Sequence, residues 1–214
     1  MLETAFGYSD KLPEKIREPF VWLCLDLVGL QTKWDFFEHL YDSQENAALL
    51  SELALASFNV IRGALVTDFV MGISRLTDPP QSGRAPVQDN LTLSALVLMC
   101  ADVPEAAEWQ LQCDNLKTIA EPMRRQRNKR LAHRDLNTAI NPKESPLPGV
   151  SKADIKRFLQ GATDLMNMIL QHFDDAELYF HGPTHGGAES LLFWLNLGKA
   201  SADREREAML KGGI

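Results

Sequence analysis

Cysteine is scarce in this chain of 214 residues, and the three that occur, Cys24, Cys100 and Cys113, are widely spaced. They form no CxxC pair and no Cys/His cluster, so neither a disulfide framework nor a zinc or other metal site is predicted. Cys24 and Cys100 stand in apolar runs and are expected to be buried thiols. Free thiols suit a reducing compartment, and we therefore expect a cytoplasmic protein.

Long uninterrupted apolar runs are also missing, because charged residues break each of them, as Arg62 and Asp68 do. None approaches the roughly 18 apolar residues that a membrane span requires. The segment Met1-Leu2-Glu3-Thr4 lacks the basic and apolar regions of a signal peptide, so no membrane is expected as a partner. No glycine-rich phosphate loop and no nucleophile elbow occurs, which argues against the enzyme classes built on those motifs.

An overall positive charge is missing as well. The chain has 22 basic and 29 acidic residues and a net charge of −7, so it cannot coat nucleic acid over its whole surface. Any contact with nucleic acid must come from a local basic patch. The length is sufficient for one good core and short for two independent domains.

Alternating strand patterns are absent, and apolar residues recur instead at helical steps of three and four. One prediction is a helix over residues 44–76, about 50 Å long if continuous and ended by Thr77-Asp78-Pro79-Pro80. Residues 81–90 are predicted to form a loop, Pro104 to open a helix and Pro122 to kink or restart it. Further helices are expected over 14–41, 91–101, 151–173 and 188–199.

The predicted fold class is all-α, an antiparallel bundle of five or six helices. Residues 1–200 would form a single domain, and 201–214 a charged C-terminal tail that frays. The four tryptophans are expected in the core or at an interface between subunits, namely Trp22, Trp34, Trp109 and Trp194.

The strongest chemical signal is a basic segment near the middle of the chain. It holds seven basic residues and one acid, Glu121, and therefore carries a local charge of +6: Lys117, Arg124, Arg125, Arg127, Lys129, Arg130 and Arg134. Such a concentration of like charge indicates an anionic partner, and guanidinium groups match phosphate in geometry. The alternative is a solvated basic helix face whose charges pair with acids elsewhere.

His133 lies within this segment, directly after Leu131-Ala132. Flanking cations favour the neutral imidazole, which suits a general base. On a regular helix Arg127 and His133 would point about 120° apart and lie about 9 Å apart along the axis. Either the helix is distorted there, or Arg127 reaches around it, or the working pair comes from two subunits.

Three segments together resemble a known family. They are Ile73-Ser74-Arg75-Leu76-Thr77-Asp78-Pro79, then Arg127-Asn128-Lys129-Arg130-Leu131-Ala132-His133-Arg134-Asp135, and finally Gly186-Gly187-Ala188-Glu189-Ser190-Leu191-Leu192 with Trp194-Leu195. The arginine, polar residue, spacer and histidine of the second resemble the signature of the HEPN superfamily of helical domains. The wider chain, from about residue 20 to 200, resembles its abortive-infection U-type (AbiU-like) subfamily.

The resemblance implies a bundle that dimerises and brings two copies of the motif into one cleft. Active members are metal-independent endoribonucleases, so no cofactor is expected. By this resemblance His133 would be the general base or acid at a ribose 2′-hydroxyl or a leaving 5′-oxygen, and Arg127 would stabilise the phosphorane-like transition state. Asn128 would orient the histidine or a phosphate oxygen. RNA or its phosphates would be bound by Arg124, Arg125, Lys129, Arg130 and Arg134.

The implied role is that of a phage-defence or toxin component, with RNA as substrate or ligand and an antitoxin protein as a further partner. Asp135 departs from HEPN proteins that carry a tyrosine there, so modification by a partner transferase is not expected. Two alternatives remain open: a non-catalytic HEPN module that binds RNA, a nucleotide or a protein, and a structural bundle whose basic patch docks onto an acidic partner.

Two residues outside the motif are assigned a supporting role. Arg75 and Asp78 are expected to border the cleft and to position the segment of Arg127 and His133. The structural alternative is that Arg75 and Asp68 form a buried ion pair or a polar strip at an interface, because the two are seven residues apart on one helix face.

Overall fold

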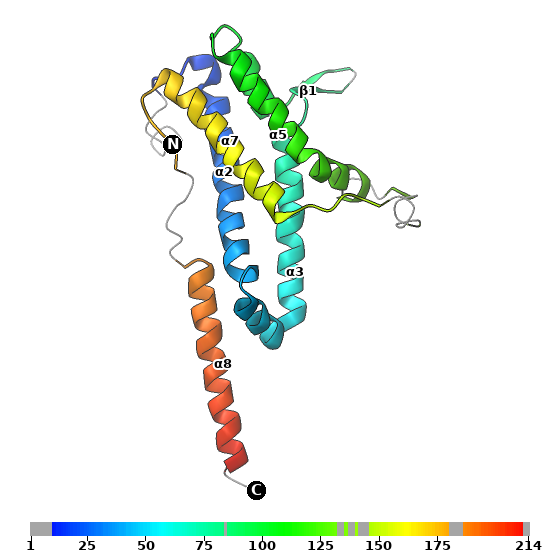
Figure 1. Ribbon diagram of the computed structural model, residues 1–214, viewed down its shortest axis with the longest axis vertical. Coiled ribbons are helices and arrows are strands. Elements are labelled where there is room, and N and C mark those ends of the chain that lie inside the picture. Colours follow the sequence, from blue (N-terminus) through cyan, green and yellow to red (C-terminus); the bar gives the residue numbers. More distant parts are fainter. Residues whose placement is uncertain are drawn as a thin grey trace. The chain divides into compact units, whose positions relative to one another are not determined.

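The computed structural model describes residues 10–83, 85–131, 135–136, 140, 146–179 and 186–211. Their regular structure is almost entirely helical, which confirms the predicted all-α class (Figure 1). Six α-helices and a π-helical segment, η1, are described, in this order: α2 (Glu14–Tyr41), α3 (Gln44–Leu76), α4 (Leu93–Met99), α5 (Ala106–Gln126), η1 (Arg127–Leu131), α7 (Lys152–Phe173) and α8 (Ala188–Lys211).

The chain divides into two compact units. Unit 1 comprises Met1–Gln31 and Thr67–Phe180, and unit 2 comprises Thr32–Val66 and His181–Ile214. Helices α2 and α3 each contribute one part to each unit. The basic segment and the end of α3 belong to unit 1, so this unit contains the described part of the motif.

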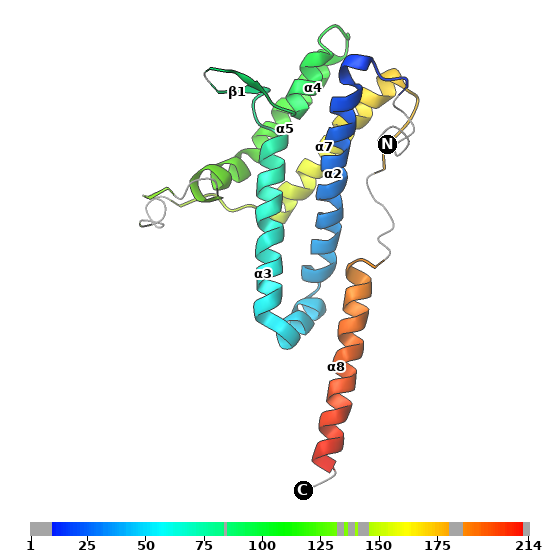
Figure 2. The same ribbon diagram turned by 180° about the vertical axis from the view of Figure 1, so that it is seen from behind.

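Unit 1 has two layers of helices. In Figure 1, α5 and α7 lie in front of the parts of α2 and α3 that belong to this unit, and Figure 2 shows the same layers from behind. Gly72 marks the close approach of α3 to α2, since an added Cβ would come within 2.7 Å of Cδ2 of Leu30. The core between the layers contains large aromatic side chains, since Phe20, Phe69, Trp109 and Phe158 are each at most 1% exposed.

Local sequence signals set several helix ends. The Ser151 hydroxyl accepts a hydrogen bond from the Asp154 N–H at 3.0 Å and caps α7, which confirms the predicted start of this helix. Thr92 caps α4 in the same way. Helix α3 ends at Leu76, ahead of Thr77-Asp78-Pro79-Pro80 as predicted, because the residue before a proline disfavours the helical conformation.

The structure corrects or adds to four expectations about the elements. The condition of continuity attached to the helix over 44–76 is not met, since Ala54 has non-helical angles (φ −160°, ψ 62°); Leu50 and Phe58 on either side of it are buried in one cluster. The predicted loop after α3 contains a short antiparallel ladder, β1 (Gln81–Ser82) and β2 (Gln88–Asp89), too brief to leave an alternating pattern. Helix α5 begins beyond Pro104, and Pro122 lies inside it, so of the two expectations for Pro122 the restart does not occur.

The fourth concerns the C-terminal tail. Helix α8 continues to Lys211 instead of ending near residue 199. Charged side chains one turn apart support the extension, because Lys199 contacts Asp203 at 3.4 Å and Lys211 contacts Glu207 at 3.5 Å.

Unit 2 buries fewer residues than unit 1, among them Trp34 and Phe37 of α2. Leu40, Leu50, Phe58 and Ala188 form its core cluster, and the Tyr41 hydroxyl donates a hydrogen bond to the Phe58 carbonyl at 2.9 Å. Other large apolar side chains of this unit are exposed: Leu53, Leu55, Val60, Ile61, Val66, Phe193, Trp194, Leu197, Met209 and Leu210. By length and composition alone α3 would suffice to cross a membrane, and 11% of the tested window is buried.

The tryptophans divide between core and surface. Trp34 and Trp109 are 2% and 1% exposed, whereas Trp22 and Trp194 are 50% and 64% exposed. Cys24 and Cys100 are buried free thiols as predicted, and so is Cys113. Burial raises the pKa of the Cys113 thiol to about 11, although a hydrogen bond with Ser94 acts in the opposite direction.

Candidate functional site

The motif begins where α5 changes its helical type. At Arg127 the chain passes from α5 into η1, a wider π-helical turn that includes Arg127–Leu131. Such turns are rare and frequently occur at functional sites. The helix is therefore distorted over the first five residues of the motif. His133 and Arg134 lie outside the described residues.

One carboxylate holds this turn in place. Oδ2 of Asp78 lies 2.5 Å from Nη1 of Arg127, and its Oδ1 lies 3.4 Å from Nη1 of Arg124. The three side chains are only 18–25% exposed, so water screens these contacts less than it screens surface pairs. Asp78 thus binds two arginines from successive turns and ties the start of the motif to the end of α3.

The end of α3 is well suited to receive these arginines. The last carbonyl groups of a helix lack partners within it and carry a partial negative charge. Arg124 donates a hydrogen bond to the Thr77 carbonyl in addition to its ion pair with Asp78. The buried Thr77 hydroxyl donates in turn to the Ile73 carbonyl at 2.9 Å, which fixes this last turn.

The remaining described residues of the motif point more toward solvent. Nε of Arg127 donates to Oδ1 of Asn128 at 3.0 Å, so Arg127 contacts both Asp78 and Asn128. Lys129 pairs with Asp135 at 2.9 Å, and the Asp135 N–H donates to the Lys129 carbonyl at 3.0 Å. Asn128, Lys129 and Arg130 are exposed.

The residues expected to bind phosphate therefore differ in their surroundings. Arg125, Lys129 and Arg130 are exposed, whereas Arg124 is partly buried against α3. Some of the segment's charge is paired with acids, since Lys117 contacts Asp114 at 3.1 Å and Lys129 contacts Asp135. The exposed cations at the end of α5 and in η1 form a basic surface that an anion can approach.

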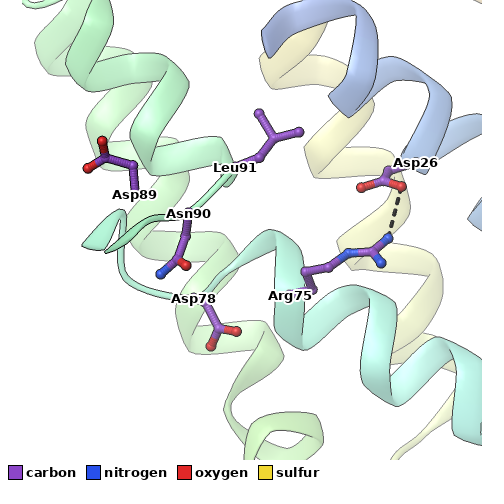
Figure 3. Close-up of a pocket in the computed structure, with 6 residues that line it drawn as sticks. All are labelled: Asp26, Arg75, Asp78, Asp89, Asn90 and Leu91. Atoms are coloured by element: carbon purple, nitrogen blue, oxygen red, sulfur yellow. Dashed lines mark hydrogen bonds and ion pairs between the residues drawn. The ribbon is translucent and has the colours of Figure 1, made fainter. Parts of the chain in front are cut away.

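Arg75 has a different partner from the one considered for it. Its Nη2 lies 2.8 Å from Oδ1 of Asp26 on α2, and its side chain is 62% exposed. The alternative of a buried ion pair with Asp68 was therefore wrong, because Arg75 lies at the surface. Figure 3 shows Arg75 extended toward Asp26 at the side of a pocket that Asp78 also lines.

No pattern in the sequence was taken to predict this pocket. It is lined by Asp26, Arg75, Asp78, Asp89, Asn90 and Leu91. Asp26 did leave a signal, because it is the single charged residue in the otherwise apolar stretch from Phe20 to Leu30. Asp89, Asn90 and Leu91 left none, since their position depends on the small hairpin that follows α3.

Fold and site together define a helical protein in which Asp78 joins the Arg127 turn to the end of a second long helix. The comparison with family models identifies the family: the model described as AbiU2, an HEPN family, matches residues 14–187. The chain therefore belongs to the AbiU2 family of HEPN domains. No curated protein and no solved structure matches the chain.

Proposed function

We propose that this protein is a metal-independent endoribonuclease of HEPN type that acts as a phage-defence or toxin component. Membership of the AbiU2 family supports such a role at the level of the family. The observation that carries the proposal is the Asp78–Arg127 ion pair of 2.5 Å at the start of an exposed basic π-helical turn. This pair holds one guanidinium in a defined direction, as a site for a reacting phosphate requires.

The proposed reaction uses only groups of the protein and of the RNA. His133, as general base, removes the proton of a ribose 2′-hydroxyl, and the 2′-oxygen attacks the adjacent phosphorus. The bond from phosphorus to the 5′-oxygen breaks, a proton passes to that oxygen, and a 2′,3′-cyclic phosphate forms. The contacts of Arg127 with Asp78 and Asn128 engage Nη1 and Nε, and the proposal assigns Nη2 to the phosphate.

The test is cleavage of total RNA by the purified protein in the presence of a chelator. We expect 2′,3′-cyclic phosphate ends, and we expect His133→Ala to lower the rate by about 10²–10⁴-fold. Lys117→Ala is a matched control, because Lys117 belongs to the same basic segment but lies near the middle of α5, paired with Asp114. Activity that survives His133→Ala, or that requires a divalent metal, would refute the mechanism.

A second function, a non-catalytic HEPN module, is supported by the partial pairing of the basic residues with acids. It would bind RNA, a nucleotide or a protein such as an antitoxin, without turnover. Tight RNA binding with no cleavage, unchanged by His133→Ala, would favour this function over the first.

The proposal also includes a homodimer, for which unit 2 supplies a surface. Between Ser51 and Val66 of α3, Phe58 is the only buried residue, although the segment is strongly apolar. Exposed patches of this kind mark interaction sites. A second copy is favoured over a bilayer because Arg62 lies in this segment, and a charge at the centre of a membrane costs about 3 kcal/mol.

The dimer is tested by light scattering coupled to gel filtration. Val60 is 72% exposed, so Val60→Glu should leave the fold intact and convert dimers to monomers. Leu111→Glu, at an apolar residue of unit 1 that is 63% exposed, is the control and should not dissociate them. A wild-type monomer at micromolar concentration, or binding to lipid vesicles that Val60→Glu abolishes, would contradict the proposal.

A further inference from the structure

The pocket beside the motif has the size and chemistry of a base-binding site. Its volume is about 380 Å³, and its lining residues come from α2, from the last turn of α3 and the residues just beyond it, and from β2 and the two residues that follow β2 (Figure 3). Leu91, 41% exposed, supplies an apolar surface. The other five lining residues carry hydrogen-bonding groups, which orient a ligand rather than merely enclose it.

Asp78 connects this pocket to the motif. It lines the pocket and at the same time binds Arg127 at 2.5 Å. In a nucleotide, base and phosphate are joined through one sugar, so a base in the pocket would place its phosphate close to Arg127. The pocket and the motif can therefore engage neighbouring parts of one RNA strand.

The charges of the pocket favour an uncharged ligand. Its three carboxylates, Asp26, Asp78 and Asp89, are balanced by Arg75 within the pocket and by Arg124 and Arg127, which bind Asp78. The formal sum is −3 + 3 = 0. Among the described residues, moreover, no group of three or more His, Cys, Asp or Glu side chains is arranged to hold a metal ion.

We propose that this pocket binds a guanine base of single-stranded RNA and so selects the sequence that the protein engages. The Asp26–Arg75 pair presents acceptors and donors side by side, since Nη2 of Arg75 uses only Oδ1 of Asp26. Arginine is the usual partner of the guanine O6 and N7 acceptors. The guanine N1–H and 2-amino groups are two adjacent donors that match the Asp26 carboxylate.

Other bases fit this set less well. Adenine and cytosine offer an amino donor with no adjacent ring N–H, and uracil offers a ring N–H with no amino group. Proteins that recognise single-stranded RNA by sequence form hydrogen bonds with the Watson–Crick and Hoogsteen edges of unstacked bases. The proposed specificity therefore depends on the donors and acceptors that each base presents on these edges.

The inference rests on the proposed function for its choice of RNA as ligand, and the test separates the two. Fully 2′-O-methylated oligonucleotides cannot undergo 2′-hydroxyl attack, so they report binding alone. We would measure their affinity by fluorescence anisotropy with a uridine tract that carries one central guanosine, adenosine or inosine. We expect the guanosine form to bind about tenfold or more tightly than the adenosine form, and inosine to bind between them.

Two variants and one control test the pocket. Arg75→Gln and Asp26→Asn should each reduce the preference for guanosine to within about twofold. Asp114→Asn, which breaks the exposed pair with Lys117 on α5, should preserve it. Thermal unfolding of each variant checks that the fold is retained, which we expect because Arg75 is 62% exposed and Asp26 32% exposed.

Each outcome decides one of the two proposals. If guanosine is preferred and the variants remove the preference, the pocket assignment stands even where unmodified RNA is not cleaved. If RNA is cleaved under chelation but the wild type shows no base preference, or the variants retain one, the pocket assignment is wrong and the ribonuclease proposal stands. Absence of RNA binding altogether refutes the pocket assignment together with the RNA-based function.

Discussion

The two units of this protein bury apolar side chains to different extents. Unit 1 buries Trp109 and Phe158 completely and has partly buried ion pairs at the end of α3, although Trp22 and Leu111 stay exposed. Unit 2 has a core cluster of four buried residues and leaves Val60 and Trp194 more than 60% exposed. Because exposed apolar patches mark interaction sites, the contrast supports the proposal that a second copy of the chain covers the exposed apolar side chains of unit 2.

The prediction with the largest expected effect compares the same substitution, tryptophan to alanine, in the two units. Trp109→Ala should destabilise unit 1 by about 3–5 kcal/mol, because it removes a large side chain that is 1% exposed and leaves a cavity. Trp194→Ala, at a residue that is 64% exposed, should change the free energy of unfolding by less than about 0.5 kcal/mol at dilute concentration. Urea unfolding followed by circular dichroism measures both.

A concentration series provides the control for this pair. If unit 2 binds a second copy, the effect of Trp194→Ala on stability should grow with protein concentration, since association stabilises the folded form. The effect of Trp109→Ala should not depend on concentration. Equal losses for both substitutions at dilute concentration would remove the distinction between the units.

The second test uses pH. Burial holds the Cys113 thiol neutral in unit 1 and raises its pKa from 9.0 to about 11. The unfolded chain therefore loses this proton first as pH rises, so the stability contributed by the neutral thiol is complete below pH 9 and is lost between about pH 9 and 11. The loss approaches about 3 kcal/mol, at about 1.4 kcal/mol per pKa unit.

Melting temperatures of the wild type and Cys113→Ala should therefore converge as pH rises over this range. Cys113→Ala has no thiol to titrate there, although its cavity lowers its stability at neutral pH. A parallel fall of the two curves would show that other groups cause the alkaline loss.

The third test concerns the ion pairs of unit 1. Asp78→Asn should cost about 2 kcal/mol, because it weakens charged hydrogen bonds to both Arg124 and Arg127 in a partly buried setting. Asp26→Asn is the matched control and should cost less than about 1 kcal/mol, since its partner Arg75 is 62% exposed. Hydrogen exchange of the Arg127–Leu131 amides should accelerate in the first variant and remain unchanged in the second.

The helices of this protein were largely predictable, for local reasons. Helices α2 and α7 begin and end where the sequence indicates, because a proline or a capping serine stands at their start and apolar residues follow at helical spacing. The break at Ala54 was not predictable, since alanine favours helices and the conformation there depends on how Leu50 and Phe58 pack. The helical extension of α8 depends on ion pairs between charged residues that resemble a tail.

The candidate site was predictable as a segment but not as an arrangement. Its charge excess and its family resemblance directed attention to Arg127, and the proline pair that ends α3 directed attention to Asp78. Nothing local revealed that Arg124 caps α3 through the Thr77 carbonyl, or that Asp26 pairs with Arg75, because these contacts join residues 47 and 49 positions apart. The roles of His133 and Arg134 remain predictions.

The smallest test compares one capping bond from each unit. Ser151 caps α7 in unit 1 with a 3.0 Å bond from the Asp154 N–H, and Ser43 caps α3 in unit 2 with a 3.3 Å bond from the Asn46 N–H. Ser151→Ala should cost about 1 kcal/mol. Ser43→Ala should cost less, because its bond is longer and its helix is interrupted a few residues later, at Ala54.

The Ser151 hydroxyl also donates a hydrogen bond to Oδ2 of Asp154 at 2.7 Å, which lowers the pKa of Asp154, and Arg157 lowers it further. A lowered pKa contributes stability above the unfolded value of 3.8, which is lost as pH falls through the lower value in the folded protein. The difference between wild type and Ser151→Ala should therefore be complete at pH 7 and shrink below pH 4, whereas that for Ser43→Ala should not change. An equal dependence on pH in both variants would mean that these caps do not distinguish the units, and that the contrast lies in the cores alone.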